Sequence, residues 1–284
     1  MTLNLLIAMS WLEALILGVV QGLTEFLPVS SSGHLEIGQA LLGTASEENL
    51  TFTVLLHVAT VLSTIVVLRR EIGQLLTGTF TTVKWNEDKQ YVALLLLSCI
   101  PVFIVGVFFK DEVEQFFGNG LLLVGICLLV TAFLLALSEY LTKRRMSVAQ
   151  DATHEVGWKD ALIIGCAQAV AVLPGLSRSG STIATGLLCG VKKESVARFS
   201  FLMVLIPVLG DAFLETLDLL TGKVTAPAIG WLPMSIGFLA AFITGSAACR
   251  WMLEIVRKQK LIYFALYCVA AGGFAIIYHF VGQG

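Results

Sequence analysis

Charged residues are scarce in this sequence: Asp, Glu, Lys and Arg make up 13% of its 284 residues. A soluble domain carries roughly 25% charged residues. Hydrophobic residues reach 57% of the chain. These values exclude an ordinary soluble domain and indicate an all-α polytopic membrane protein. The net charge of −2 gives no sign of nucleic-acid binding, because the charged residues are sorted between loops.

Paired cysteines are also missing. The six cysteines stand singly in apolar segments and form no CxxC motif, so neither a zinc site nor a disulfide framework is expected. We interpret them as small apolar packing residues. The N-terminus has neither a basic segment nor an obvious cleavage site, so no signal peptide is predicted.

Two polar stretches interrupt the apolar segments. Residues 21–34 contain a carboxylate (Glu25), a proline, three consecutive serines, a glycine and an imidazole (His34). Such groups are costly in hydrocarbon, so their presence at membrane depth indicates function. Residues 168–182 repeat part of this pattern 147 positions later, and Phe52 and Phe199 match at the same offset. The pattern predicts a diverged duplication.

The hydropathy pattern predicts six transmembrane helices and two re-entrant helical hairpins, arranged as an inverted-topology repeat. The first repeat, 1–142, is expected to hold a hairpin (3–42, its second helix over 35–42) and three spans. The second repeat, 158–284, follows a cytoplasmic linker at 143–157. Its hairpin is expected to have a loop over 174–180 and a short helix over 181–190. The spans are predicted at 52–68, 91–109, 121–140, 196–217, 229–249 and 261–280, with a linker over 69–90.

The basic residues support this topology. Fifteen of the eighteen Lys and Arg residues fall on one predicted side, Lys110 and Lys223 fall on the other, and Arg178 lies in the second hairpin. The positive-inside rule places the first side in the cytoplasm. Glu47 and Glu48 are then outside. The first hairpin enters from the outside and the second from the cytoplasm, so their tips are expected to meet within the membrane.

The two tips together offer the groups that phosphate chemistry needs. The guanidinium of Arg178 matches phosphate oxygens and keeps its charge when buried. Glycines and hydroxyl residues around a helix N-terminus offer N–H and O–H groups to an anion; these are Ser30, Ser32, Gly33, Ser177, Ser179 and Thr182. A structural pair between Arg178 and Glu25 is the alternative.

Glu25 and His34 are candidate acid–base groups, and they are expected to assist attack by Ser31, which precedes His34 by three residues. Gln21 lies one helical turn before Glu25 and is expected to orient it or a water. We interpret His57 and His279 as packed polar residues and His154 as a loop residue.

Gln21-x-x-x-Glu25, followed by Pro28-Val-Ser-Ser-Ser-Gly-His34 and later by Pro174-Gly-x-Ser-Arg178-Ser-x-x-Thr182, resembles the undecaprenyl-diphosphate phosphatase family, which is linked to bacitracin resistance. The resemblance covers nearly the full chain. It implies hydrolysis of a phosphoric anhydride: undecaprenyl diphosphate becomes undecaprenyl phosphate and inorganic phosphate, which recycles the lipid carrier for peptidoglycan synthesis. The family's functional residues fall on Glu25, Ser31, His34, Ser177, Arg178 and Thr182. Gln21 departs from the Glu often found there, which argues against a proton donor or charged metal ligand at that position.

The resemblance further implies a bacterial inner (plasma) membrane location, with the site open to the outer side. It implies bacitracin as a competitor that binds the substrate. No carboxylate cluster suggests a protein metal site, so Mg²⁺ or Ca²⁺ would travel on the diphosphate. The nucleophile stays open among Ser31, His34 and water, and a homodimer stays open too. A lipid-phosphate transporter or flippase is the alternative function, because inverted repeats with broken helices are typical of transporters.

Overall fold

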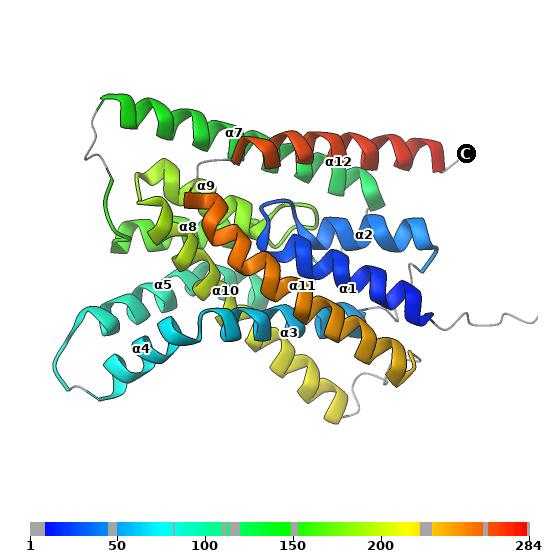
Figure 1. The fold of residues 1–284 in the computed structure, drawn as a ribbon, viewed down its shortest axis with the longest axis horizontal. Helices are drawn as coiled ribbons and strands as arrows, with labels where there is room; N and C mark the ends of the chain where they lie inside the picture. Colours follow the sequence, from blue (N-terminus) through cyan, green and yellow to red (C-terminus); the bar gives the residue numbers. More distant parts are fainter. Residues whose placement is uncertain are drawn as a thin grey trace, which may run out of the picture.

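The computed structural model describes residues 9–44, 50–81, 83–109, 112–113, 120–148, 153–221, 229–257 and 261–282. Glu47, Glu48, Lys110 and Lys223 of the charge analysis lie outside these ranges. Apart from one isolated bridge between His154 and Val191, the regular structure within them is helical. The helices are α1 (Trp11–Phe26), α2 (Ser31–Leu42), α3 (Leu50–Val67), α4 (Arg69–Phe80), α5 (Glu87–Phe108), α7 (Gly120–Val148), α8 (Trp158–Val170), α9 (Arg178–Cys189), α10 (Lys193–Leu220), α11 (Trp231–Arg257) and α12 (Leu261–Gly282), as Figure 1 shows.

Several of these helices are suited to a membrane. Among the described residues, α5, α7, α11 and α12 are each long and apolar enough to cross it. Helices α3 and α4 pass the same test together, although the chain bends by 75° between them. Large apolar side chains face outward on these helices: Phe103, Phe133 and Leu266 are 68%, 65% and 62% exposed. Lipid, unlike water, accommodates such side chains without cost, so a multi-pass membrane protein is supported.

The segment over 69–90 differs from its predicted form. It is not a plain linker, because Arg69–Phe80 forms helix α4. None of the α4 residues is buried, and Glu71 lies in its first turn, where a negative charge favours the helix dipole. Helix α7 also extends to Val148, so the predicted linker at 143–157 begins inside a helix.

Both short hairpin helices begin earlier than predicted, for the same reason. Helix α2 starts at Ser31 rather than at residue 35, and α9 starts at Arg178 rather than at residue 181. The preceding serine caps each one: Ser30 Oγ accepts from Gly33 N at 3.3 Å, and Ser177 Oγ accepts from Gly180 N at 3.0 Å. A serine cap satisfies an N–H that lacks a partner within the helix. Predicted loop residues therefore lie in the first helical turns.

The first helix of each hairpin packs along a longer helix, and two longer helices pack on each other. Helix α1 lies along α11, α8 lies along α5, and α7 lies beside α12 at one edge of the molecule (Figure 1). Glycines allow the close approaches: a Cβ at Gly18 of α1 would meet the carbonyl of Gly237, and one at Gly165 of α8 would meet the backbone of Ser98. Small residues commonly bring membrane helices together in this way. The two hairpins are thus held between the long helices.

Candidate active site

The first hairpin turns between Phe26 and Ser31. Ser30 has φ +68°, and it is the non-glycine residue with positive φ in the part of the chain that the structure describes. Such a conformation costs roughly 1–3 kcal/mol and is common at functional sites. It directs the Ser30 carbonyl to the N–H of His34 at 3.2 Å and to His34 Nδ1 at 2.7 Å. The turn presents Ser31 at the first position of α2.

The second hairpin turns at Gly175, which has φ +86°. A Cβ there would be strained and would also meet the backbone of Val124. Ser177 N donates to Thr131 Oγ1 at 3.0 Å, which ties the turn to α7. Thr182 Oγ1 donates to the carbonyl of Arg178 at 2.9 Å and braces the first turn of α9. Arg178 is therefore presented from a well-supported helix start.

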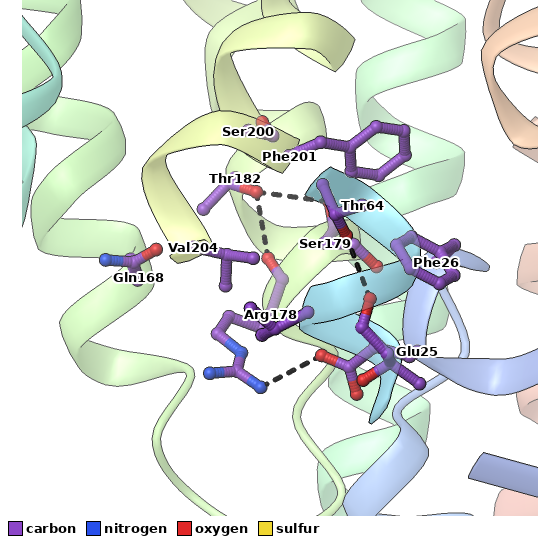
Figure 2. A pocket seen from close by; sticks show the side chains of 12 residues that line it. Glu25, Phe26, Thr64, Gln168, Arg178, Ser179, Thr182, Ser200, Phe201 and Val204 are labelled. Atoms are coloured by element: carbon purple, nitrogen blue, oxygen red, sulfur yellow. Dashed lines mark hydrogen bonds and ion pairs between the residues drawn. The ribbon is translucent and has the colours of Figure 1, made fainter. Parts of the chain in front are cut away.

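The structure brings the two tips together, as the sequence predicts. Arg178 NH2 lies 3.1 Å from Glu25 Oε1, and Figure 2 shows this pair between the hairpins. Ser179 Oγ donates to the carbonyl of Leu27 at 3.1 Å. The side chains of Glu25 and Arg178 are 10% and 26% exposed, so water screens the pair only in part. The pair joins residues that are 153 positions apart in the chain.

Glu25 collects further partners on its second oxygen. Ser31 Oγ donates to Oε2 at 2.6 Å and Gln21 Nε2 donates to it at 2.9 Å. His57 Nε2 lies 3.7 Å from the same oxygen. Gln21 is therefore hydrogen-bonded to the carboxylate that it was expected to orient. Glu25 in turn is placed to accept the proton of the Ser31 hydroxyl.

Two cavities meet at the Glu25–Arg178 pair. The larger has a volume of about 290 Å³, while the smaller, of about 20 Å³, has room for little more than one water molecule. Glu25, Gln168, Arg178 and Ser179 line both. The larger cavity is also lined by further hydroxyl side chains, by His57 and by apolar residues: Thr24, Ser30, Ser31, Ser32, Thr53, Val54, His57, Val102, Ala171, Val172, Leu176, Ser177, Pro207 and Val208. It has the size and the polar floor that a phosphate head group requires.

His34 has a different setting from the other predicted residues. Its Nε2 lies 2.7 Å from the hydroxyl of Tyr267 on α12, and the two rings stack with centroids 5.5 Å apart. Its Nδ1 is held by the Ser30 carbonyl. His34 does not line the larger cavity. The assistance of His34 to Ser31 therefore stays a prediction, while the contacts give it a role in fixing the turn.

The sequence analysis missed two polar residues of this site. His57, expected to be a packed residue, lines the larger cavity beside Glu25. Gln168 lines both cavities, is fully buried, and neither polar atom of its side chain has a hydrogen-bond partner. Sequence signals existed for both. His57 belongs to a polar stripe of α3 at helical spacing (Thr53, His57, Thr60, Thr64), and Gln168 is the counterpart of Gln21 in the repeated stretch.

A divalent cation would find few ligands from the protein here. Among the residues that the structure describes, no three His, Cys, Asp or Glu side chains gather as a metal site. Glu25 is the carboxylate of the larger cavity, and it already contacts Arg178 and Ser31. A cation that arrives with a diphosphate would take most of its ligands from phosphate oxygens and water.

Comparisons with known proteins identify the family. The family model described as "Bacitracin resistance protein BacA" matches residues 14–274. An undecaprenyl-diphosphatase of Parabacteroides distasonis is 57% identical over 264 residues, which cover 93% of this chain and 96% of that protein. Proteins of the same name from Bacteroides fragilis and Christiangramia forsetii are 55% and 46% identical, over 95% and 94% of this chain and 98% and 97% of their own length. The chain therefore belongs to the bacitracin resistance protein BacA family.

Proposed function

We propose that this chain is a membrane phosphatase that hydrolyses undecaprenyl diphosphate to undecaprenyl phosphate and inorganic phosphate. Its similarity to proteins named undecaprenyl-diphosphatase supports this substrate. One geometric observation carries the proposal: a hydroxyl (Ser31), a carboxylate (Glu25) and a guanidinium (Arg178) form one chain of contacts on the wall of the larger cavity.

The first step is phosphoryl transfer to Ser31. Its Oγ attacks the terminal phosphorus and passes its proton to Glu25 Oε2, which accepts that hydrogen bond at 2.6 Å. The bond between the terminal phosphorus and the bridging oxygen breaks, and undecaprenyl phosphate leaves with the electron pair. Arg178 has five N–H donors, so it can bind phosphate oxygens while it keeps Glu25. Its fixed charge stabilises the developing negative charge, which is the main catalytic requirement in phosphoryl transfer.

The remaining residues bind and orient the head group. The first turn of a helix leaves N–H groups without partners inside that helix, and α2 and α9 both begin at this cavity. Gln21 orients Glu25, and Ser30 and Ser177 fix the two helix starts. Ser32 and Ser179, which line the larger cavity, complete the proposed cradle, while Gly33 and Thr182 brace the two helix starts. His34 holds the strained Ser30 turn through its carbonyl.

Rapid-quench mass spectrometry with farnesyl diphosphate tests this route. The expected result is a transient phosphate on Ser31, and its loss in Ser31→Ala together with turnover. Ser235→Ala, on an exposed residue of α11, is the control and should keep normal activity. Phosphate on His34 would overturn the serine route, while phosphate release with no adduct at all would favour direct attack by water. Tight binding without phosphate release would support a carrier instead of an enzyme.

We further propose the inverted repeat of 1–142 and 158–284, with six spans at α3, α5, α7, α10, α11 and α12. The caps Ser30 and Ser177 and the left-handed C-caps Gly43 and Gly190 are each 147 positions apart. The pairings of α1 with α11 and of α8 with α5 are those that exchange of the two repeats would generate. Helices of twelve residues, such as α2 and α9, are too short for a bilayer that needs about 20.

We propose that the chain lies in the bacterial inner membrane, with the site open to the outer side. Labelling of intact cells by a membrane-impermeant thiol reagent tests it. A cysteine introduced at the exposed Val83 should be protected, because residues 69–90 are cytoplasmic, whereas one at Trp231 should react. The reverse labelling would contradict the orientation. The cysteine-free chain serves as the background.

A further inference from the structure

We propose that His57 is a catalytic residue of this site: its Nε2 takes the proton from the water that hydrolyses the phosphorylated Ser31. The proposal rests on the function proposed above and assigns the second half of the reaction. It gives this role to an imidazole from α3, outside both hairpin motifs.

The backbone of α3 fixes the His57 ring in a useful form. Nδ1 lies 2.9 Å from the carbonyl of Thr53, one helical turn earlier. A carbonyl oxygen can only accept, so Nδ1 carries the hydrogen. In the neutral ring Nε2 then has the free lone pair, and it faces Glu25 Oε2 at 3.7 Å. In catalytic histidines, the hydrogen bond at one ring nitrogen commonly sets which nitrogen carries the proton. The other nitrogen is then left to act as the base.

The location of His57 suits an attacking water. Its side chain is 17% exposed and lines the larger cavity together with Ser31 and Arg178. Its ring lies beside Glu25 of α1, whose other oxygen pairs with Arg178 of α9. A water between His57 Nε2 and the phosphorus on Ser31 would thus lie in the cavity that both residues line.

His34 is less suited to this proton transfer. Both of its ring nitrogens have protein partners, Ser30 O and the hydroxyl of Tyr267, each at 2.7 Å. It also lies outside the lining of the larger cavity. His57, in contrast, has one nitrogen held by the backbone and the other directed to the carboxylate beside Ser31.

The second step balances as follows. The water oxygen forms a bond to phosphorus while one of its O–H bonds breaks, and that proton moves to His57 Nε2. The bond from phosphorus to Ser31 Oγ breaks, and Oγ recovers a proton from Glu25, which had gained one in the first step. Inorganic phosphate leaves, Glu25 is again a carboxylate, and His57 releases its proton to solvent through the cavity. Each residue returns to its starting state.

His57→Gln tests this assignment, because glutamine keeps a polar side chain of similar reach but cannot carry a proton at neutral pH. The variant should still complete the first step. We expect a burst of about one equivalent of prenyl phosphate per enzyme, followed by slow turnover with kcat lowered about 10²-fold or more and KM changed little. Phosphate on Ser31 should accumulate. His279→Gln, on a histidine near the end of α12 and outside both cavities, is the control and should behave like the unmodified chain.

Two further readouts separate catalysis from a structural effect. Imidazole added to His57→Ala should restore part of the turnover, which a misfolded protein would not show. The Ser31 adduct that accumulates in His57→Gln is the second readout, because a misfolded chain would not complete the first step. Normal kcat in His57→Gln, or a raised KM alone, would overturn the proposal for His57. Phosphate release and a Ser31 adduct in the same experiment would still support the proposed function. Absence of any Ser31 adduct while phosphate is released would overturn the serine route instead.

Discussion

Replacement of Arg178 by alanine should remove most of the catalytic power of the site. A full charge pair at about 4 Å and an effective dielectric constant of about 20 interacts by about 4 kcal/mol. The Arg178 side chain is 26% exposed, so solvent screens part of this. Loss of one well-placed oxyanion donor costs about 2.7–4 kcal/mol in other enzymes, and we expect the middle of that range. This corresponds to a fall in kcat of about 10²–10³-fold.

The measurement is phosphate release from farnesyl diphosphate in detergent, at saturating and at low substrate. Arg178→Lys is the matched variant: it keeps the charge but loses the planar fork of donors, so it should recover only part of the rate. Thermal unfolding of each variant controls for stability. We expect Arg178→Ala to stay folded, because Glu25 keeps its contacts with Ser31 and Gln21. Turnover of a well-folded Arg178→Ala within threefold of the unmodified chain would refute the placement of the phosphate.

Two further predictions concern the support of the site. Gln168→Leu should raise KM and leave stability unchanged or higher, because both amide atoms of Gln168 are buried and unpaired without substrate. Enzyme kinetics and a melting curve check this prediction. A lower Tm with normal KM would contradict it. Gly175→Ala should lower Tm and activity together, since φ is +86° and the new Cβ would meet the backbone of Val124; Gly73→Ala, where a Cβ meets nothing within 4 Å, is its control.

Much of the fold could be predicted from local sequence patterns. The apolar runs located α5, α7, α11 and α12, because a lipid environment demands long helices without many charges. They did not reveal α4, whose residues are too polar for a span and which follows a 75° bend after α3. They also set the starts of α2 and α9 too late. A serine that caps a helix resembles a serine in a loop until its side chain is seen to accept the N–H three residues on.

The candidate site was predictable where its residues stand together in the chain. Ser30 to His34 and Ser177 to Thr182 form dense polar motifs. The topology predicted from the charge pattern placed Glu25 close to Arg178. Pairings across space were harder to predict. Ser31 lies three residues before His34, yet its hydroxyl donates to Glu25, because the positive φ of Ser30 turns the chain back toward α1. His57 lies in a different helix, and its polar neighbours are visible only at helical spacing.

A structure with a non-hydrolysable farnesyl methylenediphosphonate tests the central claim most directly. We predict that its terminal phosphorus lies in the larger cavity, with the Arg178 guanidinium on its oxygens and Ser31 Oγ in line with the bridging carbon. His57 Nε2 should face the same phosphorus across one water. A phosphonate bound away from Arg178 and Ser31, or held by one hairpin alone, would contradict the account.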